Sequence, residues 1–303
     1  MSSIYIIALA TPDGALQYED LYTQVVSLRS HCVYQSLIIN MKAVRFVYAD
    51  ALLALTSVVR LWYQWSGRKV FFRDLDYKVH RYLERMDFFE KCADWLEQHR
   101  VLESNKRLDR KEYSERLLEV TPIPSDEEKN AVIVPISVDR IRKILNSTAN
   151  RHTTNINELC TMLAEITHNV IHSSDQGFAV VQRYRTSGII QSYRVMIGVV
   201  DLGIGIEDSL QRSEVSLLKP GDQNRLILGS DYIMKALDFG VSSRNSGGGL
   251  GLWQVRRIVE NWRGTLTIRS QKSRVHITAN TVMCVDNLAE IPGTQVTISV
   301  QGS

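Results

Sequence analysis

The chain has 303 residues, which is enough for two ordinary domains that each bury a core. Hydrophobic residues make up 44% of it and charged residues 23%, as in an ordinary soluble globular protein. The 36 basic and 33 acidic side chains leave a net charge of only +3. A nucleic-acid-binding domain is expected to be strongly basic, so no nucleic-acid partner is expected.

Cysteine spacing and hydropathy exclude several other classes. Cys32, Cys92, Cys160 and Cys284 lie far apart and form no CxxC pair, so neither a zinc site nor a disulfide framework is expected. The apolar start, residues 4–10, runs into a turn and predicts a strand rather than a signal peptide. No run reaches the roughly 20 apolar residues that span a bilayer. We therefore expect a soluble, cytoplasmic protein without a membrane partner.

The first 98 residues alternate predicted strands and helices, which favours a small α/β layer structure. Asp50 is expected to cap a helix that is apolar nearly all round, and Gly67 lies just beyond its end. The expected elements are strands at 4–10, 36–40 and 69–72 and helices at 51–65 and 79–89. Residues 1–98 are therefore predicted to form the first domain.

Residues 99–130 are expected to be a charged linker, because charges crowd the stretch 99–119 and two prolines follow it. The second domain, 131–303, is expected to place a helix layer on a mostly antiparallel sheet. Its expected elements are helices at 157–172, 230–239 and 250–263 and strands at 178–185, 191–201, 266–269, 276–283 and 295–300.

The first of three polar clusters lies on the helix predicted over 157–172. Its apolar stripe is Leu159, Met162, Leu163, Ile166 and Val170. Glu165 and Asn169 are four residues apart and flank this stripe on one side. A carboxylate there can accept a proton beside a phosphate, and an amide oxygen suits Mg²⁺. Taken alone, an ordinary polar pair at the edge of the core explains them better.

The second cluster is the stretch Asp201-Leu-Gly203-Ile-Gly205, which follows the apolar run 195–200 of a buried strand. Asp201 therefore emerges at a strand end, where ligand contacts are common. Its carboxylate can accept a hydrogen bond from the amino group of adenine, and the glycines allow the backbone to approach the base. A tight turn after a strand explains the pattern equally well.

The third cluster, Gly247–Leu252, is rich in glycine and directly precedes a predicted helix. Backbone N–H groups at a helix start, with the positive end of the helix dipole, suit phosphate groups. The spacing is neither that of a Walker loop nor that of a dinucleotide-binding turn. A flexible loop before a helix is the alternative for this cluster alone.

The three clusters in this order resemble the GHKL ATPase superfamily (gyrase, heat-shock chaperone, histidine kinase, mismatch repair) over about residues 130–303, and among its members the anti-sigma factor serine kinases. The matching residues are Glu165 and Asn169 (N box), Asp201, Gly203 and Gly205 (first glycine box), Gly247, Gly248, Gly249, Leu250, Gly251 and Leu252 (second glycine box), and Gly293 with Thr294 (terminal Gly-Thr).

This resemblance implies a Bergerat-fold α/β two-layer sandwich that binds ATP and Mg²⁺. It implies that Asp201 holds adenine, Asn169 holds the metal, and residues 207–246 form an ATP lid, which explains a connection too long for an ordinary loop. The chain departs from the serine-kinase members at Ser173, where those members often carry histidine.

Residues 1–98 more loosely resemble the STAS fold of anti-sigma factor antagonists, through the stretches 37–46 and 47–52. Phosphorylatable members carry a serine in this loop, whereas this chain has Ala49. Because alanine has no hydroxyl, phosphorylation of this loop is disfavoured.

Two functions follow from these observations. In the first, the ATPase domain transfers the γ-phosphate to water or to a partner protein, as an ATPase or a protein serine/threonine kinase in a partner-switching type of signalling, with Glu165 as general base. In the second, ATP binding is a conformational switch that changes affinity for a protein bound through the STAS-like domain. The expected partner is a protein, of the STAS or another regulatory type, and a homodimer is an open alternative. Intact Glu165, Asn169 and Asp201 argue against a degenerate scaffold.

Overall fold

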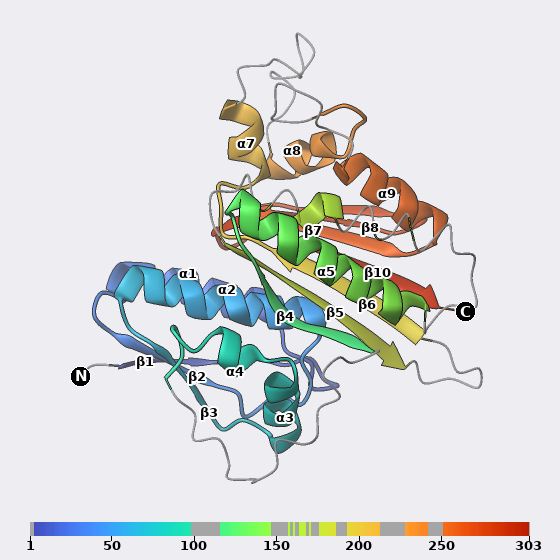
Figure 1. The fold of residues 1–303 in the computed structure, drawn as a ribbon. Coiled ribbons are helices and arrows are strands. Elements are labelled where there is room, and N and C mark those ends of the chain that lie inside the picture. Colours follow the sequence, from blue (N-terminus) through green and yellow to red (C-terminus); the bar gives the residue numbers. More distant parts are fainter. Residues whose placement is uncertain are drawn as a thin grey trace. The chain divides into compact units, whose positions relative to one another are not determined.

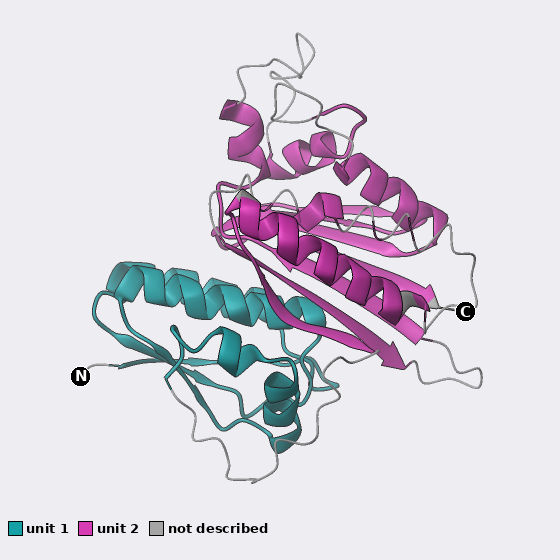
Figure 2. Ribbon diagram, in the orientation of Figure 1, with its two compact units in different colours: residues 1–114 teal, residues 115–303 magenta. Residues whose placement is uncertain are grey.

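The computed structural model of the chain describes residues 3–97, 116–146, 157, 160, 164–167, 170, 176–185, 193–212, 228–241 and 251–302. The chain divides into two compact units, Met1–Ser114 (unit 1) and Glu115–Ser303 (unit 2), which Figure 2 colours separately. None of the helices within the described ranges is long and apolar enough to cross a bilayer.

Unit 1 is built on three parallel strands in the order β1-β2-β3 (Figure 1). The strands are β1 (Ser3–Ile7), β2 (Ser36–Asn40) and β3 (Val70–Arg73), and the helices are α1 (Tyr18–Ser27), the 3₁₀ turn η1 (Arg29–His31), α2 (Ala49–Ser66), α3 (Tyr77–Arg85) and α4 (Phe88–Lys91). The expected alternation of strands and helices is found.

Helix α2 is buried almost all round, as its apolar sequence predicts. It begins at Ala49, so Asp50 lies in its first turn rather than at the N-cap, and the Asp50 carboxylate accepts a hydrogen bond from the Ala51 N–H at 2.8 Å. Gly67 ends the helix in the left-handed conformation at φ 67°, as expected of a glycine in this position.

The single helix expected over 79–89 is wrong, because the structure has two helices, α3 and α4. Asp87 separates them at φ 56°, a left-handed conformation that cannot continue a right-handed helix but that aspartate tolerates. The break places Phe88, which is fully buried, 5.9 Å from the ring of Phe72 on β3. Burial of this aromatic side chain favours the broken helix over a continuous one.

Unit 2 contains a seven-stranded sheet in which every pair of neighbouring strands is antiparallel, as predicted. The strand order is β4-β5-β6-β10-β7-β8-β9. Their bounds are β4 (Leu117–Ile123), β5 (Gly177–Arg185), β6 (Tyr193–Val200), β7 (Thr265–Gln271), β8 (Ser273–Ile277), β9 (Val282–Val285) and β10 (Ile291–Gly302).

The helices of unit 2 share one hydrophobic core with this sheet. They are α5 (Glu127–Asn146), α7 (Ile206–Arg212), α8 (Gly229–Ala236) and α9 (Gly251–Asn261), and the described residues from 157 to 170 are also helical. Ile144 of α5, Val170, Ile233 of α8 and Val255 of α9 belong to the same buried cluster as the inward side chains of the strands. The predicted helix layer on an antiparallel sheet is therefore found (Figure 1).

The linker predicted over 99–130 is wrong in its second half. Residues 117–123 form β4, which pairs with β5, and α5 begins at Glu127. Pro122 has no N–H and therefore argued against a strand, but β4 is an edge strand of the described sheet, where proline is tolerated. The boundary between the two compact units lies at Ser114 and Glu115, within the predicted interval.

The strand predicted over 276–283 is also wrong, because the chain turns within it. Residues 278–281 form a tight turn between β8 and β9, in which the Thr278 N–H donates to the Thr281 carbonyl oxygen at 2.9 Å. The hydroxyls of Thr278 and Thr281 are 2.8 Å apart and strengthen the turn. Two β-branched threonines read as strand residues in the sequence but here stabilise a reversal.

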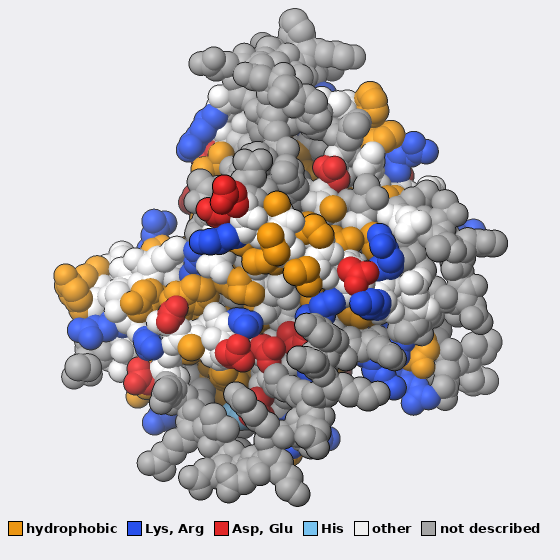
Figure 3. Space-filling view, viewed as in Figure 1, with side chains coloured by type: hydrophobic (Ala, Val, Ile, Leu, Met, Phe, Trp, Pro, Cys, Tyr) orange, Lys and Arg blue, Asp and Glu red, His pale blue; other side chains and the backbone are white. Residues whose placement is uncertain are grey.

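Helix α5 buries one side and leaves an apolar opposite side exposed. Val134, Ile141 and Ile144 face the core, whereas Val132 and Ile136 are 61% and 57% exposed. Hydrophobic side chains gather over α5 on the face shown in Figure 3. The helix is thus apolar on two sides, and the outer apolar side is open to solvent.

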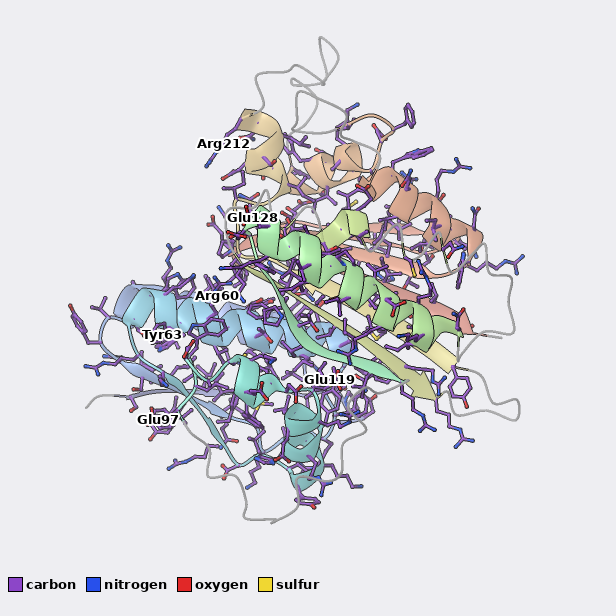
Figure 4. All side chains as sticks on the ribbon, in the orientation of Figure 1. Arg60, Tyr63, Glu97, Glu119, Glu128 and Arg212 are labelled. Carbon is purple, nitrogen blue, oxygen red and sulfur yellow. The ribbon has the colours of Figure 1, made fainter. Side chains whose placement is uncertain are left out.

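An ion pair joins α5 to β4. Arg140 Nη2 lies 2.5 Å from Glu119 Oε2, and the two side chains are 19% and 12% exposed (Glu119 is labelled in Figure 4). Truncation of Glu119 leaves a largely buried guanidinium without this partner. We expect E119A to lower the free energy of local opening of α5 by about 1–3 kcal/mol, measured by amide hydrogen exchange in the full chain.

D139N is the matched control, because the Asp139–Lys143 pair on the same helix is 52% and 70% exposed. This variant should leave the exchange of α5 nearly unchanged, since exposed ion pairs contribute little. Equal effects of the two variants would contradict a structural role of the Glu119–Arg140 pair.

Candidate functional site

Asp201, Thr294 and Ser270 lie side by side at one end of three neighbouring strands, β6, β10 and β7, and together are called the row. β10 lies between β6 and β7, and its Thr294 pairs with Ser270 at the end of β7. On the other side of β10, the Asp201 N–H donates to the Thr294 carbonyl oxygen at 3.0 Å. Asp201 and Thr294, both predicted to bind nucleotide, are therefore neighbours although they lie far apart in the sequence.

The Ser270 hydroxyl connects this row to helix α7. Ser270 is 4% exposed. Its hydroxyl oxygen accepts a hydrogen bond from the Ile206 N–H at 2.9 Å, and the hydroxyl donates one to the Gly293 carbonyl oxygen at 3.1 Å. Thr294 Oγ1 lies 3.3 Å away. The sequence prediction did not include Ser270, because a serine at a strand end has no distinctive sequence signal.

Gly293 makes the closest backbone contact in the row. Its φ of 82° lies in the left-handed region, and a Cβ atom at this position would overlap the carbonyl oxygen of Asp201. Only glycine fits such a contact. The Gly-Thr pair therefore has a physical basis here, because glycine lets β10 reach Asp201 and threonine continues the ladder to Ser270.

The Asp201 side chain is held by its own turn. Its Oδ1 accepts a hydrogen bond from the Gly203 N–H at 2.8 Å, which is the geometry of an Asx turn. Asp201 and Gly203 are both partly exposed. The carboxylate is therefore held in one orientation on a residue that is partly exposed.

Gly205, two residues beyond this turn, packs against Gln271. A Cβ atom at Gly205 would lie 2.7 Å from Gln271 Cγ and 2.9 Å from its Oε1. The Oε1 atom is buried, and no hydrogen-bond partner for it exists among the described residues. An unsatisfied buried acceptor costs about 1–3 kcal/mol, so it needs an explanation. Gln271 was not predicted as a site residue.

Glu165 lies on the helical segment whose next residues enter the core. Ile166 and Val170 are 3% and 1% exposed, as the predicted stripe requires, and Glu165 is partly exposed at its border. A Cβ atom at Gly177 would lie 2.6 Å from Val170 Cγ1 and 2.7 Å from the Val200 carbonyl oxygen. This helix therefore packs directly beside the strand that leads into Asp201.

Glu165 also adjoins the start of α9. A Cβ atom at Gly251 would lie 3.2 Å from both Cβ and Oε2 of Glu165. Gly251 is the first residue of α9, so the positive end of the helix dipole is close to the carboxylate. The structure thus brings one residue of the third cluster into contact with the first cluster.

Several predicted site residues lie outside the described residues. They are Asn169, Gly247, Gly248, Gly249 and Leu250. Where the structure describes the chain, no group of three or more His, Cys, Asp and Glu side chains could hold a metal ion. The prediction of Asn169 as a Mg²⁺ ligand therefore stays a prediction.

The described part of this domain is a two-layer α/β structure that collects polar groups where strands end. Residues 154–301 match the family described as "Histidine kinase-, DNA gyrase B-, and HSP90-like ATPase". This part of the chain is therefore a GHKL ATPase-family domain, in agreement with the motifs. The match does not extend to unit 1, so the STAS resemblance stays a prediction.

A solved structure, the "Histidine kinase domain from Erythrobacter litoralis EL346 blue-light activated histidine kinase", is similar to the chain at 13% identity, with 93% of each chain covered and a TM-score of 0.23. A similarity at this TM-score supports no functional argument. No relative was found among the curated proteins.

The Gly293 contact can be tested by alanine substitution. We expect G293A to disrupt the row, because the new methyl group overlaps Asp201 in addition to the unfavourable φ. G240A is the matched control, since Gly240 has φ 76° but no described atom within 4 Å of the new Cβ. The control should cost only the about 1–2 kcal/mol of the left-handed conformation. Amide hydrogen exchange of β6 and β10 measures both, and equal effects would refute the contact.

Proposed function

We propose that unit 2 binds ATP with Mg²⁺ at the row formed by Asp201, Thr294 and Ser270, and that Glu165 acts as the general base of phosphate transfer. The family match supports this proposal, as do the close approach of Gly251 to Glu165 and the hydrogen bond between Asp201 and Thr294. The observation that carries it is the position of Glu165, which lies beside Gly251 of α9 on a helix packed next to the strand of Asp201.

The described residues fit a nucleotide in three respects. The Asp201 carboxylate is oriented by Gly203 on a partly exposed residue, and it is proposed to accept a hydrogen bond from an exocyclic amine. Gly205 and Gly251 let Gln271 and Glu165 lie close to the backbone of the second and third clusters, where a Cβ atom would be overlapped or crowded. The buried Gln271 Oε1 lacks a partner among the described residues, as an acceptor does when its donor arrives with a ligand.

Bound ATP would supply the γ-phosphoryl group, and Mg²⁺ held by Asn169 would neutralise its oxygens. Asp201 then selects adenine over guanine, which has no amino group at the corresponding position. Glu165 accepts the proton of an attacking water or hydroxyl at its carboxylate oxygen. Backbone N–H groups at the N-terminus of α9 would face the phosphates. The same role is proposed for the glycines before α9, which lie outside the described residues.

The acceptor that the proposal favours is water or a separate protein, in a partner-switching type of signalling. Unit 1 contributes to this inference through Ala49, which is fully buried at the start of α2 and has no hydroxyl. Under the STAS resemblance this position would carry the phosphate-accepting serine. Unit 1 is therefore proposed to bind a partner without being phosphorylated at this loop.

One observation also favours the alternative of a non-catalytic, ATP-dependent switch that binds a protein through unit 1. Tyr5, Ile38 and Phe71 pair across the three strands on one face of the sheet, and Tyr5 and Phe71 are 59% and 37% exposed. Parallel sheets are usually covered on both faces. A parallel sheet with an open apolar face suits a domain that binds another protein.

The role of Asp201 is tested by D201N. The amide loses the charge of the acceptor, so the dissociation constant of ATP should rise about 10–100-fold and the preference for ATP over GTP should narrow. Isothermal titration of the full chain with each nucleotide measures both effects. Unchanged affinity in a folded variant would show that adenine binds elsewhere.

The role of Glu165 is tested with labelled ATP, alone and with cell extract. E165Q should retain ATP binding but lose hydrolysis or protein labelling about 10²–10⁴-fold, as for loss of a general base. E260Q is the matched control, because Glu260 pairs with Arg256 on the exposed side of α9. ATP binding by the unmodified protein without hydrolysis or labelling would favour the switch instead.

A further inference from the structure

A hydrogen-bond network centred on the partly exposed Asp286 joins helix α8 to the hairpin formed by β8 and β9. Asp286 follows β9, and its Oδ1 accepts hydrogen bonds from the Ser230 N–H at 2.9 Å and the Ser273 hydroxyl at 2.6 Å. Its Oδ2 accepts from the Ser230 hydroxyl at 2.6 Å. One carboxylate thus joins the first turn of α8 to the first residue of β8.

The surroundings of Asp286 favour its charged form. Ser230 and Ser273 are each 3% exposed. Burial by itself raises the pKa of the Asp286 carboxyl, but the hydrogen bonds from Ser230 and Ser273 outweigh it and hold the pKa below its usual value. Asp286 also satisfies one of the N–H groups that the first turn of a helix leaves without an intrahelical partner.

Close packing at Gly229 reinforces this network. A Cβ atom at Gly229 would overlap the Ser273 hydroxyl oxygen and would lie 3.1 Å from Glu207 Oε2 of α7. The start of α8 therefore rests directly on β8 and beside α7. A side chain at position 229 would therefore push α8 away from β8.

Helix α8 is in turn connected to α9 and Glu165. Tyr232 and Ala236 of α8 form a small buried cluster with Leu210 of α7, and Leu252 of α9 packs against that cluster. Leu252 directly follows Gly251, which adjoins the Glu165 carboxylate. A continuous series of contacts thus leads from Asp286 through α8 to Glu165.

We propose that Asp286 is a positioning residue that locks α8 onto the β8–β9 hairpin and thereby sets the distance between α9 and Glu165. Under this proposal α8 is a fixed support, although it lies within the ATP lid that the family resemblance implies for 207–246. The part that concerns Glu165 rests on the proposed function. The part that concerns α8 does not.

The part of the proposal that concerns Glu165 predicts a specific kinetic pattern. The row of Asp201, Thr294 and Ser270 is held by its own hydrogen bonds, so ATP affinity should change less than threefold, on the order of 0.6 kcal/mol, when Asp286 is lost. Turnover should fall about 10–100-fold, because small displacements of a catalytic group have large effects. If Asp286 were merely structural, its substitution would lower ATP affinity and turnover together, along with the amount of folded protein.

The first experiment follows amide hydrogen exchange of α8 in the full chain without nucleotide. D286A should accelerate exchange in α8 at least about tenfold, and S273A, which removes one hydrogen bond and is less disruptive, should do so to a smaller degree. D286N should rescue part of the protection, because its carbonyl oxygen still accepts one hydrogen bond. E290Q is the matched control, since Glu290 lies nearby and pairs with Lys272 on the surface.

Unchanged exchange of α8 in both D286A and S273A would overturn the proposal. The second experiment compares kcat and the ATP dissociation constant of D286A and E290Q, and an equal loss in both quantities for D286A would overturn the positioning role. Because the exchange experiment contains no ATP, it remains decisive for α8 even if the unmodified protein fails to bind nucleotide. That last outcome would refute the proposed function alone.

Discussion

The contact on which the rest of unit 2 depends is the close approach of Gly293 to the Asp201 carbonyl oxygen. It brings the start of β10 against the end of β6, so the Asp201 N–H can bond to Thr294 and Thr294 can lie beside Ser270. Ser270 then holds the first residue of α7. A side chain at position 293 would separate these groups, and the polar row at the strand ends would not form.

Much of this arrangement could be predicted from the sequence, because its chemistry is carried by residues with strong local signals. An apolar run followed by Asp-x-Gly-x-Gly predicts a strand and a tight turn. The helical spacing of the apolar residues around Glu165 predicts that it lies at the border of the core. The antiparallel sheet and helix layer follow from the order of these elements.

The residues that the sequence did not reveal act through long-range contacts. Ser270, Gln271 and Asp286 carry no local pattern, and each matters because of a residue distant in the chain, namely Ile206, Gly205 and Ser230. Strand β4 was missed for a related reason, since Pro122 is excluded from a central strand but not from an edge. The local sequence indicates which conformations a residue can adopt. Its contacts with distant residues decide which of these conformations it adopts in the fold.

The two halves of the proposed site are held in different ways, and this bears on how it would work. The Asp201 half is a backbone ladder across three adjacent strands, to which the Ser270 hydroxyl adds a hydrogen bond to the Gly293 carbonyl oxygen. The Glu165 half depends on the packing of its helix against Gly177 and on the position of α9. Helix α9 in turn packs against α7 and α8 through Leu252. Under the proposed function, nucleotide binding and phosphate transfer could therefore be altered separately, and displacement of α8 would affect transfer more than binding.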